Sequence, residues 1–151
     1  ERAWIGTGGG PFARVFRTAD RGRTWQVAQT PMPASASSGI FGLRFWSEQG
    51  GVAVGGNYEA ERDSMFNVMR TGDGGKKWRA TGPMRPGGLK EGVAVLGKRL
   101  VAVGPSGTSV SDDFGKTWQR LDGSAFHAVS FAGTTGWAVG GKGAIARFVK
   151  K

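Results

Sequence analysis

Apolar and polar residues alternate in short segments along the whole chain, and turns rich in glycine, proline, serine and aspartate separate these segments. Alternation over about four to eight residues is typical of a β-strand with one buried face. The pattern therefore predicts an all-β fold of fourteen strands. The predicted strands cover residues 1–8, 12–18, 24–29, 40–46, 52–55, 65–70, 77–81, 93–96, 99–103, 108–111, 117–121, 125–131, 137–139 and 144–149.

One strand motif occurs four times, as Trp4-Ile5-Gly6, Val52-Ala53-Val54-Gly55, Val101-Ala102-Val103-Gly104 and Trp137-Ala138-Val139-Gly140. The closing glycines lie 49, 49 and 36 positions apart. A four-stranded repeat of about 40 to 50 residues is typical of a propeller blade. We therefore predict a single partial β-propeller of about three and a half four-stranded blades. The predicted units are residues 1–29, 40–81, 93–121 and 125–151.

An octet of the form Ser/Thr-x-Asp-x-Gly-x-x-Trp also recurs, at residues 18–25, 71–78 and 111–118, and we call its copies the Asp turns. The carboxylate of Asp can accept backbone N–H groups of a tight turn, Gly supplies a positive φ, and Trp anchors the returning strand. We expect hairpin turns whose tryptophans pack between blades. The repeated residues are Thr18, Asp20, Gly22 and Trp25; Thr71, Asp73, Gly75 and Trp78; and Ser111, Asp113, Gly115 and Trp118.

The Asp turns resemble the Asp-box, or BNR, repeat of β-propellers such as sialidases, xyloglucanases, sortilin-type receptors and photosystem II assembly factors. Over its whole length the chain resembles the C-terminal half of bacterial propellers related to photosystem II stability and assembly factors, which are often labelled oxidoreductases or glycosyl hydrolases. Residues 3–10, 51–56, 101–107 and 136–141 carry this resemblance together with the Asp turns. The second turn departs at Lys77, where Thr is usual, and the last unit has no such turn. The resemblance implies half of a seven-bladed ring with a sialidase-like fold, an assembly role, and a periplasmic or secreted location.

The strand count predicts a ring that is open at both ends, because the first and last units have three strands each. Blades that pack face to face leave apolar surface exposed when the ring is open. We therefore expect a partner, which is either the missing half of the propeller or a second copy of the chain.

Composition favours one folded domain with a basic surface. The 151 residues include 28 Gly, nine Phe and six Trp, which excludes a disordered chain. The net charge is +10, but the Lys and Arg residues are scattered, which favours a solvated basic surface over a dedicated polyanion site. Protein, polyanionic and carbohydrate ligands stay open, and specific nucleic-acid binding is not expected. The absence of Cys excludes disulfides and thiolate metal sites, and the absence of an 18-residue apolar run predicts no membrane span.

Few residues favour catalysis. His127 is the only histidine, which excludes a multi-histidine metal site, and we interpret it as a packed or channel-lining residue in a strand beside the ring axis. Residues 141–146 match Gly-x-Gly-x-x-Ala but lead into a strand, so we predict a turn and no dinucleotide site. No cofactor and no metal are expected. Glycoside hydrolysis needs two facing carboxylates. It stays open because several carboxylates lie on loops that could share one face. The loop carboxylates are Glu59, Glu61, Asp63, Glu91 and Asp122.

The function that the residues favour is a non-enzymatic scaffold that binds a protein or an extended ligand through loops on one face. These loops cover residues 8–12, 57–63, 85–90, 105–108 and 126–127. The candidate contact residues are Tyr58, Arg62, Arg85, Lys90 and His127. The alternative is a glycoside hydrolase, sialidase-like or other, whose catalytic residues lie partly in a missing half.

Overall fold

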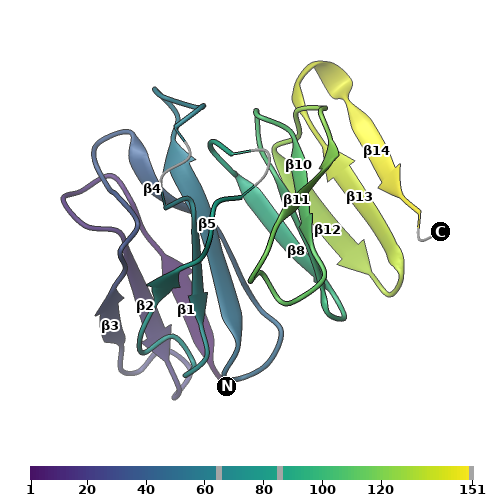
Figure 1. Ribbon diagram of the computed structural model, residues 1–151. Coiled ribbons are helices and arrows are strands. Elements are labelled where there is room, and N and C mark those ends of the chain that lie inside the picture. Colours follow the sequence, from purple (N-terminus) through teal and green to yellow (C-terminus); the bar gives the residue numbers. More distant parts are fainter. Residues whose placement is uncertain (64–65, 85–86, 150–151) are drawn as a thin grey trace.

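The structure is a computed structural model that describes residues 1–63, 66–84 and 87–149, and it is built from four antiparallel sheets (Figure 1). The all-β prediction is confirmed: the described residues contain no α-helix, and their one helical turn is a short 3-10 segment, η1 (Gly141–Gly143). In the part of the chain that is described, no helix is long and apolar enough to cross a membrane.

Each sheet is a meander in which strands that follow one another in the chain are neighbours. Sheet 1 contains β1 (Ala3–Gly6), β2 (Arg14–Thr18) and β3 (Gln26–Gln29). Sheet 2 contains β4 (Ser38–Phe45), β5 (Gly51–Asn57), β6 (Val68–Thr71) and β7 (Arg79–Ala80). Sheet 3 contains β8 (Gly92–Leu96), β9 (Arg99–Val103), β10 (Thr108–Ser111) and β11 (Gln119–Asp122), and sheet 4 contains β12 (Ala128–Ala132), β13 (Thr135–Val139) and β14 (Ile145–Phe148).

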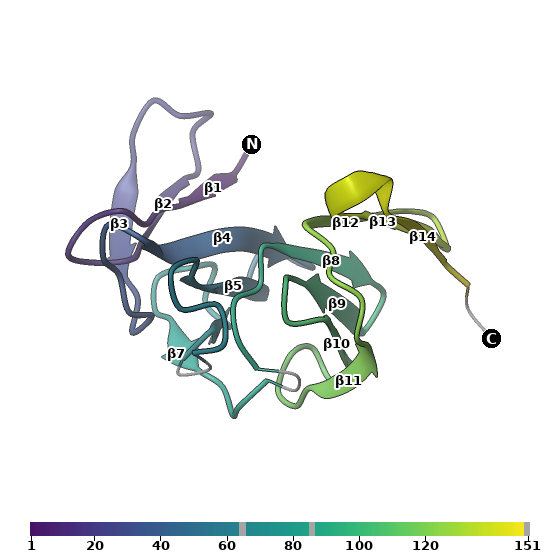
Figure 2. The ribbon, with the colours of Figure 1, turned by 90° about the horizontal axis from the view of Figure 1, so that it is seen from above.

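The sheets pack face to face in chain order along an arc (Figure 2). Strands β4, β8 and β12 lie side by side on the inner side of the arc, whereas β7 and β11 lie on its outer side. Alternation in the strands sends one set of side chains to each neighbouring sheet, so three apolar cores form between the four sheets. Val15 and Met69 belong to the first core, Val52 and Val68 to the second, and Val103 to the third.

The register of β1 differs by one residue from the predicted repeat. The first residue of each Asp turn pairs with Ala3 in β1, Gly51 in β5 and Leu100 in β9. Trp4 therefore takes the position of Val52 and Val101, whereas the alignment on glycine places Ala3 there. The physical reason is packing: Trp4 stacks on Phe45 with 3.9 Å between ring centroids, and its Nε1 donates to the Gly74 carbonyl oxygen at 2.9 Å.

The tryptophans of the Asp turns differ in burial. Trp78 packs against sheet 1 and Trp118 against sheet 2, and each is 6% exposed. Trp25 points to the side of sheet 1 where no described sheet lies, and it is 40% exposed. The expected packing between sheets therefore holds at two of the three positions, because a Trp is buried here only where a preceding sheet covers it.

The two end sheets have open apolar faces. Ile5, Trp25 and Val27 are exposed on sheet 1, and Trp137 and Ile145 are exposed on sheet 4. Sheets 2 and 3 lie between other sheets, and their second strands, β5 and β9, are buried over most of their length. Two sheet surfaces of this kind are suited to contact with further polypeptide.

Candidate binding face

The Asp turns are closed by their own side chains. In the third turn the Ser111 hydroxyl donates to Asp113 Oδ1 at 2.8 Å and accepts the Gly115 N–H at 2.7 Å. Asp113 also accepts the backbone N–H of Lys116 and both the N–H and the hydroxyl of Thr117. Burial would raise the pKa of Asp113, but these hydrogen bonds, led by those from Thr117, lower it to about 2. The hydroxyl of Ser111 and the carboxylate of Asp113 are therefore both engaged within the turn.

The second turn lacks one hydrogen bond that the other two share, the one from a Thr hydroxyl to the Asp carboxylate. In the first turn the Thr24 hydroxyl donates to Asp20 Oδ2 at 2.6 Å, and hydrogen bonds from Thr24 and Thr18 lower the pKa of Asp20 to about 2. Lys77 has no hydroxyl at this position, so Asp73 accepts only its backbone N–H there, at 3.0 Å. Burial opposes the shift, yet hydrogen bonds led by that of Lys77 still lower the pKa of Asp73.

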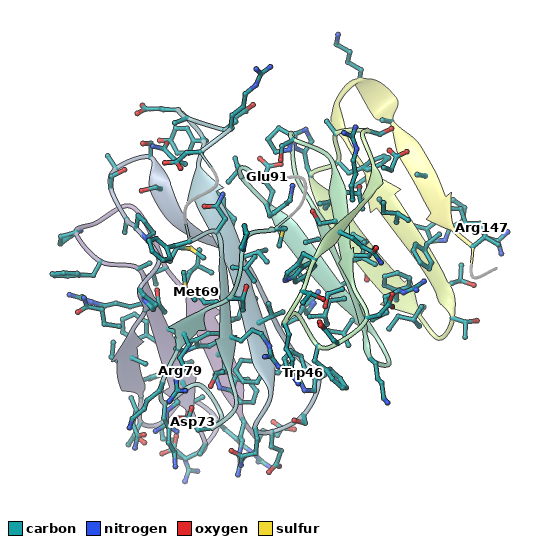
Figure 3. The ribbon with its side chains drawn as sticks, in the orientation of Figure 1. Trp46, Met69, Asp73, Arg79, Glu91 and Arg147 are labelled. Atoms are coloured by element: carbon teal, nitrogen blue, oxygen red, sulfur yellow. The ribbon has the colours of Figure 1, made fainter. Side chains whose placement is uncertain are left out.

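The opposite ends of the strands form the loop face, which consists of residues 8–12, 57–63, 87–91, 104–107 and 124–127. Figure 3 shows Asp73 of the second turn and Glu91 of the loop face at opposite ends of the molecule. The Asp turns and the loop face are therefore separate surfaces.

Tyr58 and Arg62 lie on the loop of residues 57–63, which follows β5. The Tyr58 N–H donates to the Ser37 carbonyl oxygen at 3.1 Å, and its ring meets Phe41 edge to face at 6.5 Å. Asn57 Oδ1 accepts the Glu59 N–H at 2.8 Å, which closes an Asx turn. Tyr58 is 53% exposed, and Arg62 is exposed as well. Both candidate side chains thus project from a loop whose backbone is held in place.

Lys90 is fully buried, which differs from the exposed contact residue that we expected. Its Nζ donates to Ser106 Oγ at 2.8 Å and to the Gly107 carbonyl oxygen at 3.1 Å. Burial without a carboxylate partner among these contacts lowers the pKa of the amine to about 8. Lys90 ties the loop before β8 to the turn before β10, so its role is internal. Arg85, the other candidate of this loop, lies outside the described residues.

His127 precedes β12 and does not lie within a strand, because β12 begins at Ala128. Its N–H still donates to the Val139 carbonyl oxygen at 2.8 Å, which fixes the backbone beside β13. The imidazole Nδ1 lies 2.5 Å from Glu91 Oε2, so an ion pair or hydrogen bond joins sheet 3 to sheet 4. The imidazole is exposed rather than packed in a core.

These contacts connect the loops of sheets 2, 3 and 4 into one surface. The Leu89 N–H donates to the Glu61 carbonyl oxygen at 2.7 Å, the Lys90 amine reaches Ser106, and Glu91 reaches His127. Sequence reasoning placed these loops on one face, but it did not reveal that three consecutive residues of one loop join them. Among the described residues, no group of three His, Asp or Glu side chains could hold a metal ion.

A basic hollow of about 520 Å³ lies beside the second Asp turn. Four cationic side chains line it: Arg70, Lys77, Arg79 and Lys116. Arg70 and Arg79 are direct cross-strand partners, an arrangement that is unfavourable for like charges and that an anionic group would relieve. Burial lowers the pKa of Arg70. The four cations are scattered along the chain, so the sequence analysis did not predict that they converge. The cross-strand pairing of Arg70 with Arg79 is the signal that could have indicated part of this hollow.

Comparisons with known proteins agree with the fold. No protein-family pattern and no curated protein sequence matches the chain. Its structure is similar to that of YCF48 from Cyanidioschyzon merolae, with a TM-score of 0.56 and 25% identical residues. The similarity covers 78% of this chain and 34% of that one, so the chain spans about a third of the length of YCF48. This likeness supports a propeller-like arrangement of the four sheets.

Proposed function

We propose that the chain is a non-enzymatic, propeller-like scaffold that binds a protein or an extended ligand through the loop face. The observation that carries the proposal is the set of contacts that joins the loops of three sheets through Leu89, Lys90 and Glu91. A surface that is ordered before binding loses little conformational entropy when a partner docks. Tyr58, Arg62 and His127 are its exposed contact residues, and tyrosine and arginine are enriched at the energetic centres of interfaces.

We further propose that the four sheets are blades of an Asp-box propeller, with units of residues 1–29, 40–81, 93–121 and 125–151. The hydrogen bonds of the Asp turns and the burial of Trp78 and Trp118 support this reading. The open faces of sheets 1 and 4 support the proposal that the missing half of a seven-bladed ring, or a second copy, completes the arc. The likeness to YCF48 and the resemblance to photosystem II assembly factors favour an assembly role.

Site-specific photo-crosslinking tests the binding role. A photoreactive residue at position 58 should give discrete adducts in extracts of the source cells, whereas the same residue at position 98 should not. Lys98 is the matched control because it is exposed in the turn between β8 and β9, at the strand ends away from the loop face. The partner, once purified, should bind the Arg62→Ala variant at least several-fold more weakly. Equal cross-linking at both positions would refute the loop face as the binding surface.

The alternative is a glycoside hydrolase, and it rests on the three acids Glu59, Glu61 and Asp63 of one exposed loop. A screen of polysaccharides and sialosides with the full-length gene product separates the two functions. The scaffold proposal expects no turnover. Turnover that is lost when the three acids are changed to alanine would establish the hydrolase and overturn the scaffold.

A further inference from the structure

The basic hollow is built by the two middle sheets of the arc. Arg70 lies in β6 and Arg79 in β7, which are the two outer strands of sheet 2. Lys77 belongs to the second Asp turn, and Lys116 belongs to the third. The hollow therefore lies where sheet 2 meets the turn of sheet 3, and it does not involve the open faces of the end sheets.

The cross-strand pair of Arg70 and Arg79 has a counterpart in sheet 1 that includes a hydrogen-bond acceptor. Arg17 and Arg70 each precede the first residue of an Asp turn, whereas Gln26 and Arg79 each follow its Trp. In sheet 1, Arg17 pairs with Gln26, and its Nη2 donates to Gln26 Oε1. In sheet 2, Arg79 stands in the place of the glutamine, and like charges that lie directly opposite repel each other. Sheet 2 thus lacks the acceptor that sheet 1 supplies at this place.

The Arg70 guanidinium has an unsatisfied donor. Its Nε is buried and has no hydrogen-bond partner within the described ranges of the chain. The Arg70 Cζ lies 5.8 Å from the centroid of the Trp46 ring, a cation–π contact that supplies no such acceptor. Burial disfavours the charged form and so lowers the pKa of Arg70, and only the electrostatic attraction of Asp113 opposes this. A buried, charged donor without an acceptor is costly, and an oxyanion beside the guanidinium would offset that cost.

The carboxylate in the hollow does not neutralise the cations. Asp73 lines the hollow, but its Oδ1 accepts the Thr71 hydroxyl and the backbone N–H groups of Lys76 and Lys77. Of the salt bridges between described residues, none includes a cation of the hollow. Four cations against one carboxylate leave an excess of three positive charges, which a divalent anion compensates better than a monovalent one. A volume of about 520 Å³ is typical of small-molecule sites, so the molecule that carries the anionic group has room as well.

We propose that the basic hollow binds the divalent oxyanion group, phosphate or sulfate, of a small ligand. Arg70 and Arg79 hold the group between them by charge-assisted hydrogen bonds, for which the planar guanidinium is well suited. The ammonium groups of Lys77 and Lys116 contact its outer oxygens. The ligand uses side chains that take no part in closing the Asp turns, so the hydrogen bonds of Asp73 stay intact. The site is separate from the loop face, because Arg79 and Glu91 lie at opposite ends of the molecule (Figure 3).

An NMR titration of the ¹⁵N-labelled protein with inorganic phosphate, at constant ionic strength and pH 7.5, tests the site. The backbone amides of residues 70–73 and 77–81 and the Nε–H of Arg70 should shift in a saturable way, with a Kd of roughly 1 mM or below. Sulfate should saturate the same signals, and the tighter of the two anions identifies the group that the natural ligand carries. Acetate, which is monovalent, should bind about 10-fold more weakly.

Two variants replace residues of the hollow by their counterparts in the first Asp turn and its sheet. Arg79→Gln gives Arg70 the acceptor that Gln26 gives Arg17, and it should weaken phosphate binding by about 10-fold or more. Lys77→Thr introduces the residue type of Thr24 and should weaken binding about 3-fold, because it removes one cation. Both residue types already occupy these places in sheet 1, so both variants should fold.

Lys142→Gln is the matched control, because it removes one positive charge from the exposed η1 segment outside the hollow. Phosphate binding by this variant should stay within about 2-fold of the unchanged protein, since the charge is distant and screened. An absence of saturable shifts overturns the proposal. So does an equal loss of affinity in Arg79→Gln and Lys142→Gln, or acetate binding as tight as that of phosphate. Cross-linking at position 58 is independent of these outcomes, so failure of this site and failure of the loop face are distinguishable.

Discussion

Replacing Trp118 by alanine tests whether inter-sheet tryptophans hold the arc together. The indole is 6% exposed and packs against Val52 and Val68 of the preceding sheet. A buried tryptophan removes roughly 150–250 Å² from water, which at about 25 cal/mol per Å² corresponds to about 4–6 kcal/mol. Trp-to-Ala changes in protein cores cost about 3–5 kcal/mol, so we expect a loss near 4 kcal/mol. Domains of this size are stable by about 5–15 kcal/mol, so this single change removes much of the total.

Trp25→Ala is the matched control for this prediction. Trp25 lies at the same place in its Asp turn, and both indoles donate to the backbone carbonyl oxygen of the turn glycine, at 3.1 Å for Trp25 and 3.2 Å for Trp118. The two residues therefore differ mainly in the covering sheet. Because Trp25 is 40% exposed, we expect its replacement to cost only about 1–2 kcal/mol.

Urea unfolding followed by far-UV circular dichroism at pH 7 measures both free energies of unfolding. A shift of the midpoint at an unchanged m-value reports stability alone. Trp118→Phe should recover part of the loss because it keeps an aromatic ring in the slot. If the losses at positions 25 and 118 are equal, burial against the preceding sheet is not what the Trp contributes, and the reasoning fails.

Three further predictions concern charged and hydrogen-bonded groups. Lys77→Thr should raise the free energy of unfolding by about 0.5–1.5 kcal/mol and lower the pKa of Asp73 further, because it adds the hydroxyl bond that the other turns have. An unchanged pKa of Asp73 in an NMR titration would contradict this. The pKa values of Asp20 and Asp113 are depressed to about 2 in the folded state, so the stability that they contribute is present above pH 4 and is lost between pH 4 and 2. Urea midpoints should therefore fall in this window, and they should fall less steeply in the Asp113→Asn variant. The depressed pKa of Lys90 acts in the same direction at higher pH. The unfolded state holds the proton between about pH 8 and 10.5, so stability should rise with pH in this window too, and Lys90→Met should remove that rise.

Local features of the fold could be predicted from the sequence, whereas features that depend on neighbouring sheets could not. The Asp turns bond within eight residues, so the residue types at those positions are enough to predict them. The burial of Trp25 cannot be predicted in this way, because it depends on whether another sheet lies opposite. The register of β1 shows the same limit. The closing glycine predicts one register, but the stacking of Trp4 on Phe45 of the neighbouring sheet favours another.

The candidate site shows why loop residues are harder to place. Tyr58 and Arg62 are exposed, as expected for polar residues in a charged insertion. Lys90 resembles them in sequence, yet it is buried because Ser106 and Gly107 of another turn supply its hydrogen-bond acceptors. Those partners lie 16 and 17 residues away, and only the packing of β8 beside β9 brings them near. A lysine between two glycine-rich loops therefore has no local signal that separates a contact residue from an internal tie.

The two ends of the strands have different physical roles, and this difference is the basis for assigning binding to the loop face. In the Asp turns, each Asp carboxylate and each first-position hydroxyl bonds within its own turn, so a ligand would have to break these bonds to use them. On the loop face, the internal bonds are made by backbone groups, by the buried Lys90 and by the Glu91–His127 pair, which leaves Tyr58, Arg62 and the other side of the His127 imidazole in solvent. Arg62 and the Tyr58 ring project from the loop face, whereas Lys90 holds it together from within, and His127 does both. A partner can therefore bind Tyr58 and Arg62 without breaking the side-chain contacts of Lys90 and Glu91 that hold the loops together.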